Sequence, residues 1–104
     1  GHGGVASFSL VLVAPVGRAA FLAGISRIQE RFGAGLLRIK GLVCFEGEAL
    51  PSEVHGVHGE LYPVRLLGQW PDDGRESRLV CILRGLDVDE VRGEVCAALG
   101  QPAA

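Results

Sequence analysis

Hydrophobic and polar positions alternate at the start of the chain and then change to a helical spacing. From Val5 to Val13, the apolar residues Phe8, Leu10 and Leu12 share one parity, which is the period-two pattern of a strand. After Pro15, apolar residues recur every three or four positions opposite a charged side, which predicts an amphipathic helix that ends at Gly33 and Gly35. Its apolar positions are Phe21, Leu22, Ile25, Ile28 and Phe32. Gly24 costs such a helix up to about 1 kcal/mol relative to alanine, which indicates a close packing contact there.

The segment from Leu36 to Phe45 again alternates and predicts a strand with two usable faces. Leu37, Ile39, Val43 and Phe45 fall on one face. Arg38, Lys40, Leu42 and Cys44 fall on the other.

A polar loop from Glu46 to Glu53 precedes a β-like segment, Val54 to Tyr62. Gly56 and Gly59 interrupt that segment, so we predict one bulged strand. Pro63 and Pro71 bracket a connector that has room for a short strand, and the sequence Asp72-Asp73-Gly74 is typical of a turn.

The last two elements have the clearest patterns. Arg78 to Arg84 is apolar on both parities, which places this strand in the middle of the sheet. Asp87 and Glu90 form a capping-box-like start, and Gly100 with Pro102 ends the final helix. The apolar face of this helix is Val88, Val91, Val95 and Leu99.

The resulting order is strand, helix, strand, strand, strand, helix. It predicts an α+β fold in which two or three helices pack on one face of a mainly antiparallel or mixed sheet of four to five strands. We expect one domain over residues 1–104, with residues 1–4 as a linker or the remnant of a tag.

Composition narrows the function classes. The chain has 104 residues and a net charge of −2, from 10 Lys and Arg against 12 Asp and Glu, so it lacks the basic excess that nucleic-acid binding needs. The longest apolar stretch, Val5 to Val16, is interrupted by serines and Pro15, which predicts neither a membrane span nor a signal peptide. Three cysteines lie far apart within apolar runs, as buried free thiols do in a reducing compartment, so we expect a cytoplasmic protein.

Several catalytic motifs are missing from the sequence. No phosphate-binding loop occurs, and Lys40, the only lysine, lies within a strand pattern. No C-x-x-C pair is present for a closed zinc site. The spacings do not align a base, a nucleophile and an orienting group, so a small enzyme acting alone is the least favoured class.

His55 and His58 are the candidate metal ligands. Residues three apart on a regular strand point to opposite faces, so the pair needs a bulge, or a further ligand from elsewhere, to bind a metal. The alternative is two histidines with structural roles. Asp72, Asp73 and Glu76 offer oxygen ligands, but such a sequence is ordinarily only a turn.

Two other residue types have a plain packing interpretation. Cys44, Cys81 and Cys96 would need a lowered pKa to act as nucleophiles, and core packing is the default for all three. Trp70, beside Pro71, is expected to anchor its loop to the core rather than to stack on a ligand.

Arg38, Lys40, Leu42 and Cys44 form the candidate interaction surface. A basic and apolar face of this kind is either a solvated open face or a docking surface for another domain or subunit. The pattern alone leaves both interpretations open.

These segments together resemble a known family. The run Gly35-Leu-Leu-Arg-Ile-Lys-Gly-Leu-Val43, then His55-Gly56-Val57, Leu61 to Arg65, Trp70-Pro71-Asp72 and Ser77-Arg78-Leu79-Val80 with Ile82 resembles the C-terminal domain of CobW-like GTPases. The resemblance runs from about Val5 to Leu99. The family often has a second histidine four positions after the first, whereas here Gly59 stands in that place and His58 precedes it.

The resemblance implies a role without catalysis. Members of the family are nucleotide-dependent metal chaperones, associated with cobalamin synthesis, zinc homeostasis and nitrile hydratase activation. Their N-terminal domain carries the phosphate loop, the guanine-recognition motif and a C-x-C-C metal motif, and none of these occurs here. The resemblance therefore implies a C-terminal part of a larger parent, with no cofactor of its own, while GTP with Mg²⁺ and zinc or cobalt belong to the parent.

Two function hypotheses follow. The first is a non-catalytic accessory domain that contacts the N-terminal GTPase domain of the parent, with a metalloprotein client and self-association as further partners. The second is an independent metal-binding module built on His55 and His58. Neither hypothesis involves nucleic acid or a membrane.

Overall fold

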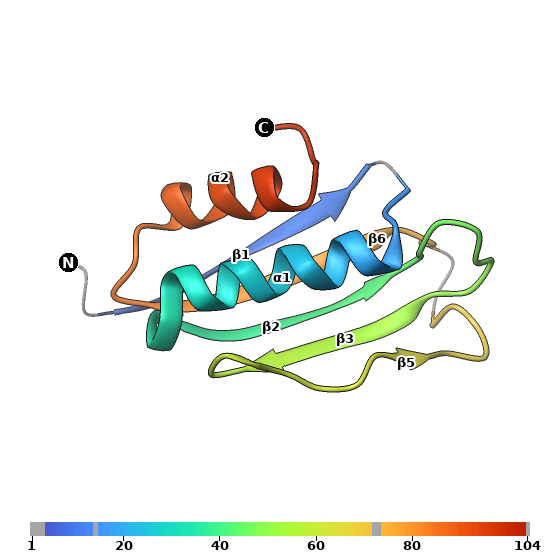
Figure 1. Cartoon of the computed structure of the whole chain (residues 1–104), viewed down its shortest axis with the longest axis horizontal. Coiled ribbons are helices and arrows are strands. Elements are labelled where there is room, and N and C mark those ends of the chain that lie inside the picture. The colour runs from blue at the N-terminus through green and yellow to red at the C-terminus, as the bar shows by residue number, and fades with distance from the viewer. Residues whose placement is uncertain (1–3, 14, 72–73, 104) are drawn as a thin grey trace.

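The computed structural model describes residues 4–13, 15–71 and 74–103. This part of the chain forms two α-helices and six strands, and five of the strands follow one another between the helices (Figure 1). In chain order they are β1 Val5–Leu12, α1 Arg18–Phe32, β2 Leu36–Val43, β3 Ser52–Val57, β4 Glu60–Leu61, β5 Arg65–Leu66, β6 Ser77–Arg84 and α2 Val88–Ala98. A short 3₁₀ turn, Gly33–Gly35, connects α1 to β2.

The strands form one sheet in the order β1-β6-β2-β3-β4, with β5 also paired to β3. All of these ladders are antiparallel. As predicted, the strand that is apolar on both parities, β6, lies between two others. Within the described residues the sheet has six strands, more than the four to five predicted. β5 lies in the connector for which a short strand was allowed, and the extra strand is β4, a two-residue strand too short to give an alternation pattern.

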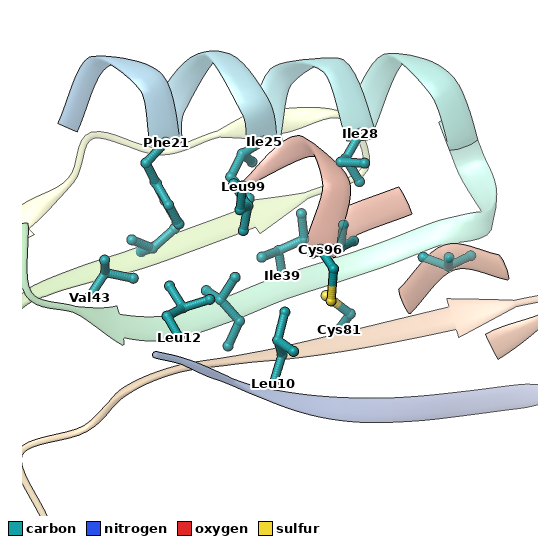
Figure 2. Close-up of a cluster of buried hydrophobic side chains, with 14 of the residues drawn as sticks. Leu10, Leu12, Phe21, Ile25, Ile28, Ile39, Val43, Cys81, Cys96 and Leu99 are labelled. Atoms are coloured by element: carbon teal, nitrogen blue, oxygen red, sulfur yellow. The ribbon is translucent and has the colours of Figure 1, made fainter. Parts of the chain in front are cut away.

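Both helices pack on the same face of the sheet. Phe21, Ile25 and Ile28 point from α1 toward side chains of the strands (Figure 2). The apolar positions of α2 join the same core, in which Phe21, Val91 and Leu79 are fully buried. Among the described residues, the opposite face of the sheet has no covering helix, and the α+β prediction is confirmed.

Local chemistry explains where the final helix begins. The Asp87 carboxylate accepts a hydrogen bond of 2.9 Å from the backbone N–H of Glu90, as the capping-box pattern predicts. Asp89 and Glu90 place negative charge in the first turn, where it is favourable to the helix dipole.

At the start of β2, the residue that faces the core differs from the prediction. Leu36 pairs with Leu83 and Arg38 with Ile82, so one extra residue of β2 lies between these two pairs. This bulge turns Leu36 into the core, where it is 2% exposed, and leaves Leu37 only half-buried. The prediction that Leu37 shares the core face of Ile39 and Val43 is therefore wrong.

The prediction of one bulged strand over Val54 to Tyr62 is also wrong. The chain reverses at His58 and Gly59, and β4 pairs back onto β3. Both turn residues have positive φ, 49° and 83°, which is the geometry of a two-residue type I′ hairpin. Gly59 therefore belongs to a tight turn between two strands rather than to a bulge within one strand. A glycine is compatible with both structures, so the residue type alone does not distinguish a turn from a bulge.

Candidate functional site

The uncovered face of the sheet is built from three cross-strand rows on its central strands, β6 and β2. Each row pairs one cationic residue with one apolar residue: Arg78 with Leu42, Val80 with Lys40, and Ile82 with Arg38. The six side chains point away from the helices, because the alternate residues of both strands are in the core. We call these six residues the central rows.

The cations of the central rows differ in how they are paired. Arg78 contacts Glu76 at 2.6 Å, and both side chains are more than half exposed. Arg38 and Lys40 are exposed and have no ion-pair or hydrogen-bond partner among the described residues. Two adjacent cations that no described residue neutralises attract an anionic partner.

A groove of about 640 Å³ follows the central rows. Its floor includes Leu42, Val80 and Ile82, which are all half-buried, and its lining also contains Trp70 and Arg75. The groove is therefore apolar at its base, and its charged lining consists of four cations, Arg38, Lys40, Arg75 and Arg78, with one carboxylate, Glu76, that pairs with Arg78.

Trp70 forms one wall of this groove. Its indole N–H donates a hydrogen bond of 3.3 Å to the backbone carbonyl of Ala49, so the connector is fastened to the loop before β3. The expectation that Trp70 anchors its loop to the core is wrong, because Trp70 is not part of the buried cluster. The proline beside it gave no indication of the groove.

Cys44 lies apart from the other three residues of the predicted surface. It follows the end of β2, its backbone N–H donates to Ser77 Oγ at 2.9 Å, and its Sγ is 3.0 Å from the carbonyl oxygen of Glu48. The groove is lined by Arg38, Lys40 and Leu42 but not by Cys44. The structure adds Arg78, Val80 and Ile82 of β6 to the predicted surface. The sequence indicated Val80 and Ile82 only through the fact that β6 is apolar on both parities.

His55 and His58 occupy different local environments. His55 is half-buried in β3, opposite Lys40, and its ring packs edge-on against Tyr62 with centroids 5.3 Å apart. Its Nε2 atom is buried and has no hydrogen-bond partner in the described structure. His58 is exposed in the hairpin turn.

The described residues contain no group of three or more His, Cys, Asp or Glu side chains placed to hold a metal ion. In the acidic turn, Glu76 pairs with Arg78. Asp72 and Asp73 lie outside the described residues. The ligand set that a closed zinc site needs is therefore not assembled in the described part of the chain.

The two buried thiols belong to the core. Cys81 and Cys96 are each 1% exposed and lie in the same cluster between helices and sheet (Figure 2). Desolvation by burial raises the pKa of the Cys81 thiol to about 12. Cys81 is thus protonated at neutral pH and unsuited to nucleophilic attack.

The fold is shared with known structures. The crystal structure of Zn(II)-bound YjiA GTPase from E. coli superposes with a TM-score of 0.73 at 24% identity, covering 91% of this chain and 29% of that one. A Zn(II)-bound triple mutant of YjiA GTPase gives a TM-score of 0.74 at the same identity and coverage. This chain accordingly spans less than a third of the length of those proteins. No curated protein sequence matches it.

Two further findings concern classification. Neither helix in the described part of the chain is both long enough and apolar enough to cross a membrane. The sequence profile of the family described as "Cobalamin synthesis protein cobW C-terminal domain" matches residues 5–99, which is nearly the whole chain. The chain that carries this uncovered face therefore belongs to the CobW C-terminal domain family.

Proposed function

We propose that this chain is a non-catalytic accessory domain of a GTP-dependent metal chaperone and that it docks on the GTPase domain of its parent through the central rows. Family membership and the shared fold with part of a Zn(II)-bound GTPase support this proposal. The chemistry of the parent then belongs to the GTPase domain, which binds GTP with Mg²⁺ and handles zinc or cobalt.

The observation that carries the proposal is the mixed character of the uncovered face. Contacts between domains of one chain are more polar than a protein core, and they combine apolar area with charged margins. Val80 and Ile82 supply apolar area, while Arg38 and Lys40 supply charge that no described residue neutralises. A face that serves only as a solvated surface has no need of three apolar residues at its centre, Leu42 on β2 with Val80 and Ile82 on β6.

Docking alone does not regulate the parent. The domain influences turnover or metal handling only if the GTP-bound and GDP-bound states of the GTPase domain make different contacts with it. The side chains of Arg38 and Lys40 are exposed and have no ion-pair partner among the described residues, so they can change partners without disturbing the core.

The test is reconstitution with the GTPase domain of the parent. GTP turnover and metal affinity are measured with the wild-type chain, with the Arg38→Ala, Lys40→Ala double variant, and with Arg27→Ala on α1 as a matched control on the opposite side. We expect the wild type and the control to shift turnover or metal affinity equally, and the double variant to shift them less. No change on adding the wild-type chain contradicts the proposal.

A second candidate function is an independent metal-binding module, and one observation favours it. The buried Nε2 atom of His55 lacks a hydrogen-bond partner, and imidazole nitrogen is a common ligand for zinc and cobalt. Titration of the chain with Zn²⁺ or Co²⁺ distinguishes the two functions. Binding tighter than about 1 mM, worth about 4 kcal/mol, that is lost in His55→Ala supports the module.

A further inference from the structure

The central strands leave no backbone groups for an occupant of the groove. β6 is hydrogen-bonded to β1 on one side and β2 on the other, and β2 is likewise paired to β6 and β3. An extended peptide laid on this face would therefore bury backbone N–H and C=O groups without partners, which costs several kcal/mol. A helix satisfies its own backbone, so it is the element suited to this face.

The charges determine which helix fits. Arg38 and Lys40 are two residues apart on the same face of β2, a separation of roughly 7 Å along the strand. Carboxylates at positions i and i+4 of a helix are separated by about 6 Å along its axis, which nearly matches that spacing. Two acidic residues one helical turn apart are therefore able to face Arg38 and Lys40 at once.

The floor of the groove adds a second requirement. Leu42, Val80 and Ile82 each lie across from one cation of the central rows, and Trp70 also lines the groove. The rows span about 14 Å, which is the length of about nine helical residues. An occupant that covers this floor needs an apolar stripe beside its acidic residues.

We propose that the groove over the central rows binds an acidic amphipathic helix, with two carboxylates one turn apart facing Arg38 and Lys40 and an apolar stripe on Val80, Ile82 and Leu42. This inference rests on the proposed function, since it names the element through which the partner docks. Salt weakens the complex, because the contact depends on charges at the margin of the groove.

The test uses a synthetic helical peptide of known sequence, with glutamates at i and i+4 and leucines on the adjacent stripe. Two matched peptides accompany it: one with both glutamates changed to glutamine, and one with a central proline that breaks the helix. Binding is followed by the anisotropy of a labelled peptide and by the fluorescence of Trp70, the only tryptophan of the chain.

We expect the acidic helix to bind, and Lys40→Glu or Arg38→Glu to weaken it by about tenfold or more. Arg27→Glu makes the same charge change on an exposed residue of α1 and is expected to leave the affinity within about twofold of the wild type. Circular dichroism confirms that each variant is folded. Equal binding of the glutamine or the proline peptide overturns the inference, as does a sedimentation result in which a second copy of the chain occupies the face instead.

The failure of this inference is distinguishable from the failure of the proposed function. If Lys40→Glu abolishes binding of the GTPase domain while the acidic peptide does not bind, the docking function stands and the helical occupant is wrong. If the peptide binds but the GTPase domain does not, the groove has the proposed chemistry and the proposed partner is wrong.

Discussion

Two glycines lie within helices, and alanine at these positions is expected to change stability in opposite directions. Gly93 is in α2 and has no atom within 4 Å of the place where a Cβ would be. Gly24 is in α1, where a Cβ would lie 2.7 Å from the carbonyl oxygen of Ala98 and 3.0 Å from Leu99 Cδ2. The comparison isolates the contact between the two helices, because the gain in helix propensity is the same at both sites.

The magnitudes follow from these distances. Replacing glycine by alanine in a helix stabilises it by about 0.8 to 1 kcal/mol, so Gly93→Ala is expected to raise the free energy of unfolding by about that amount. At Gly24 the end of α2 has to move by several tenths of an ångström, and overpacking of this kind costs about 1 to 3 kcal/mol. The net effect of Gly24→Ala is a loss of about 1 kcal/mol, so the two variants differ by roughly 2 kcal/mol.

Thermal unfolding followed by circular dichroism measures this difference. For a chain of about 100 residues, 1 kcal/mol shifts Tm by about 4 to 8 °C, so the two variants are expected to melt about 10 °C apart on opposite sides of the wild type. The reasoning is refuted if Gly24→Ala stabilises the chain as much as Gly93→Ala does, because α1 and α2 would then not be in close contact at this point.

The remaining predictions concern thiols, the hairpin and metal. With a thiol reagent at neutral pH, only the half-buried Cys44 is expected to react in the folded chain, whereas all three cysteines are expected to react in denaturant. If Cys81 or Cys96 reacted in the folded chain as fast as Cys44, the burial argument would be contradicted. Because burial raises the folded-state pKa of Cys81 from 9.0 to about 12, the unfolded state loses this proton first, and stability falls as pH rises through that interval. Between about pH 8 and pH 10 the wild type is expected to lose roughly 1 kcal/mol relative to Cys81→Val, and equal slopes of stability against pH would refute the assignment. His58→Asn is expected to preserve or slightly raise stability, since asparagine tolerates the positive φ of 49°, whereas His58→Val is expected to cost about 1 to 2 kcal/mol in denaturant unfolding. Zinc titration by calorimetry is expected to show no site tighter than about 1 mM, and a tighter site lost in His55→Ala would favour the metal-binding module.

The long elements were predictable because each carries many repeats of one pattern. The helix ending near Gly33, the central strand that is apolar on both parities and the cap at Asp87 all follow from residues close in sequence. The close contact at Gly24 was also predictable, because a glycine inside an amphipathic helix calls for a steric reason.

The errors have causes that no local pattern in the sequence displays. The bulge after Leu36 depends on pairing with β6, some forty residues away, so the alternation of β2 alone assigned Leu37 to the wrong face. The turn at His58 lacks the Asn-Gly or Asp-Gly sequence typical of type I′ hairpins, and the positive φ at a histidine was therefore missed.

The candidate site was half predictable for a similar reason. Parity placed Arg38, Lys40 and Leu42 on one face of β2, and the structure places all three in the groove lining. The other half comes from β6, and only the register joins Ile82 to Arg38 and Val80 to Lys40. The wall at Trp70 depends on a bond to Ala49 that crosses between two loops, and no periodic pattern reports such a contact.

The central claim is that the face of Arg38 and Lys40 contacts the GTPase domain, and Lys40 itself offers the most direct measurement. Lys40 is the only lysine in the chain, so its labelling by an amine-specific reagent reports on the uncovered face without mutation. Labelling rates are compared by mass spectrometry for the chain alone and for the chain saturated with the GTPase domain of its parent. The account predicts that Lys40 is labelled several-fold more slowly in the complex; an unchanged rate in a complex that has demonstrably formed would contradict it.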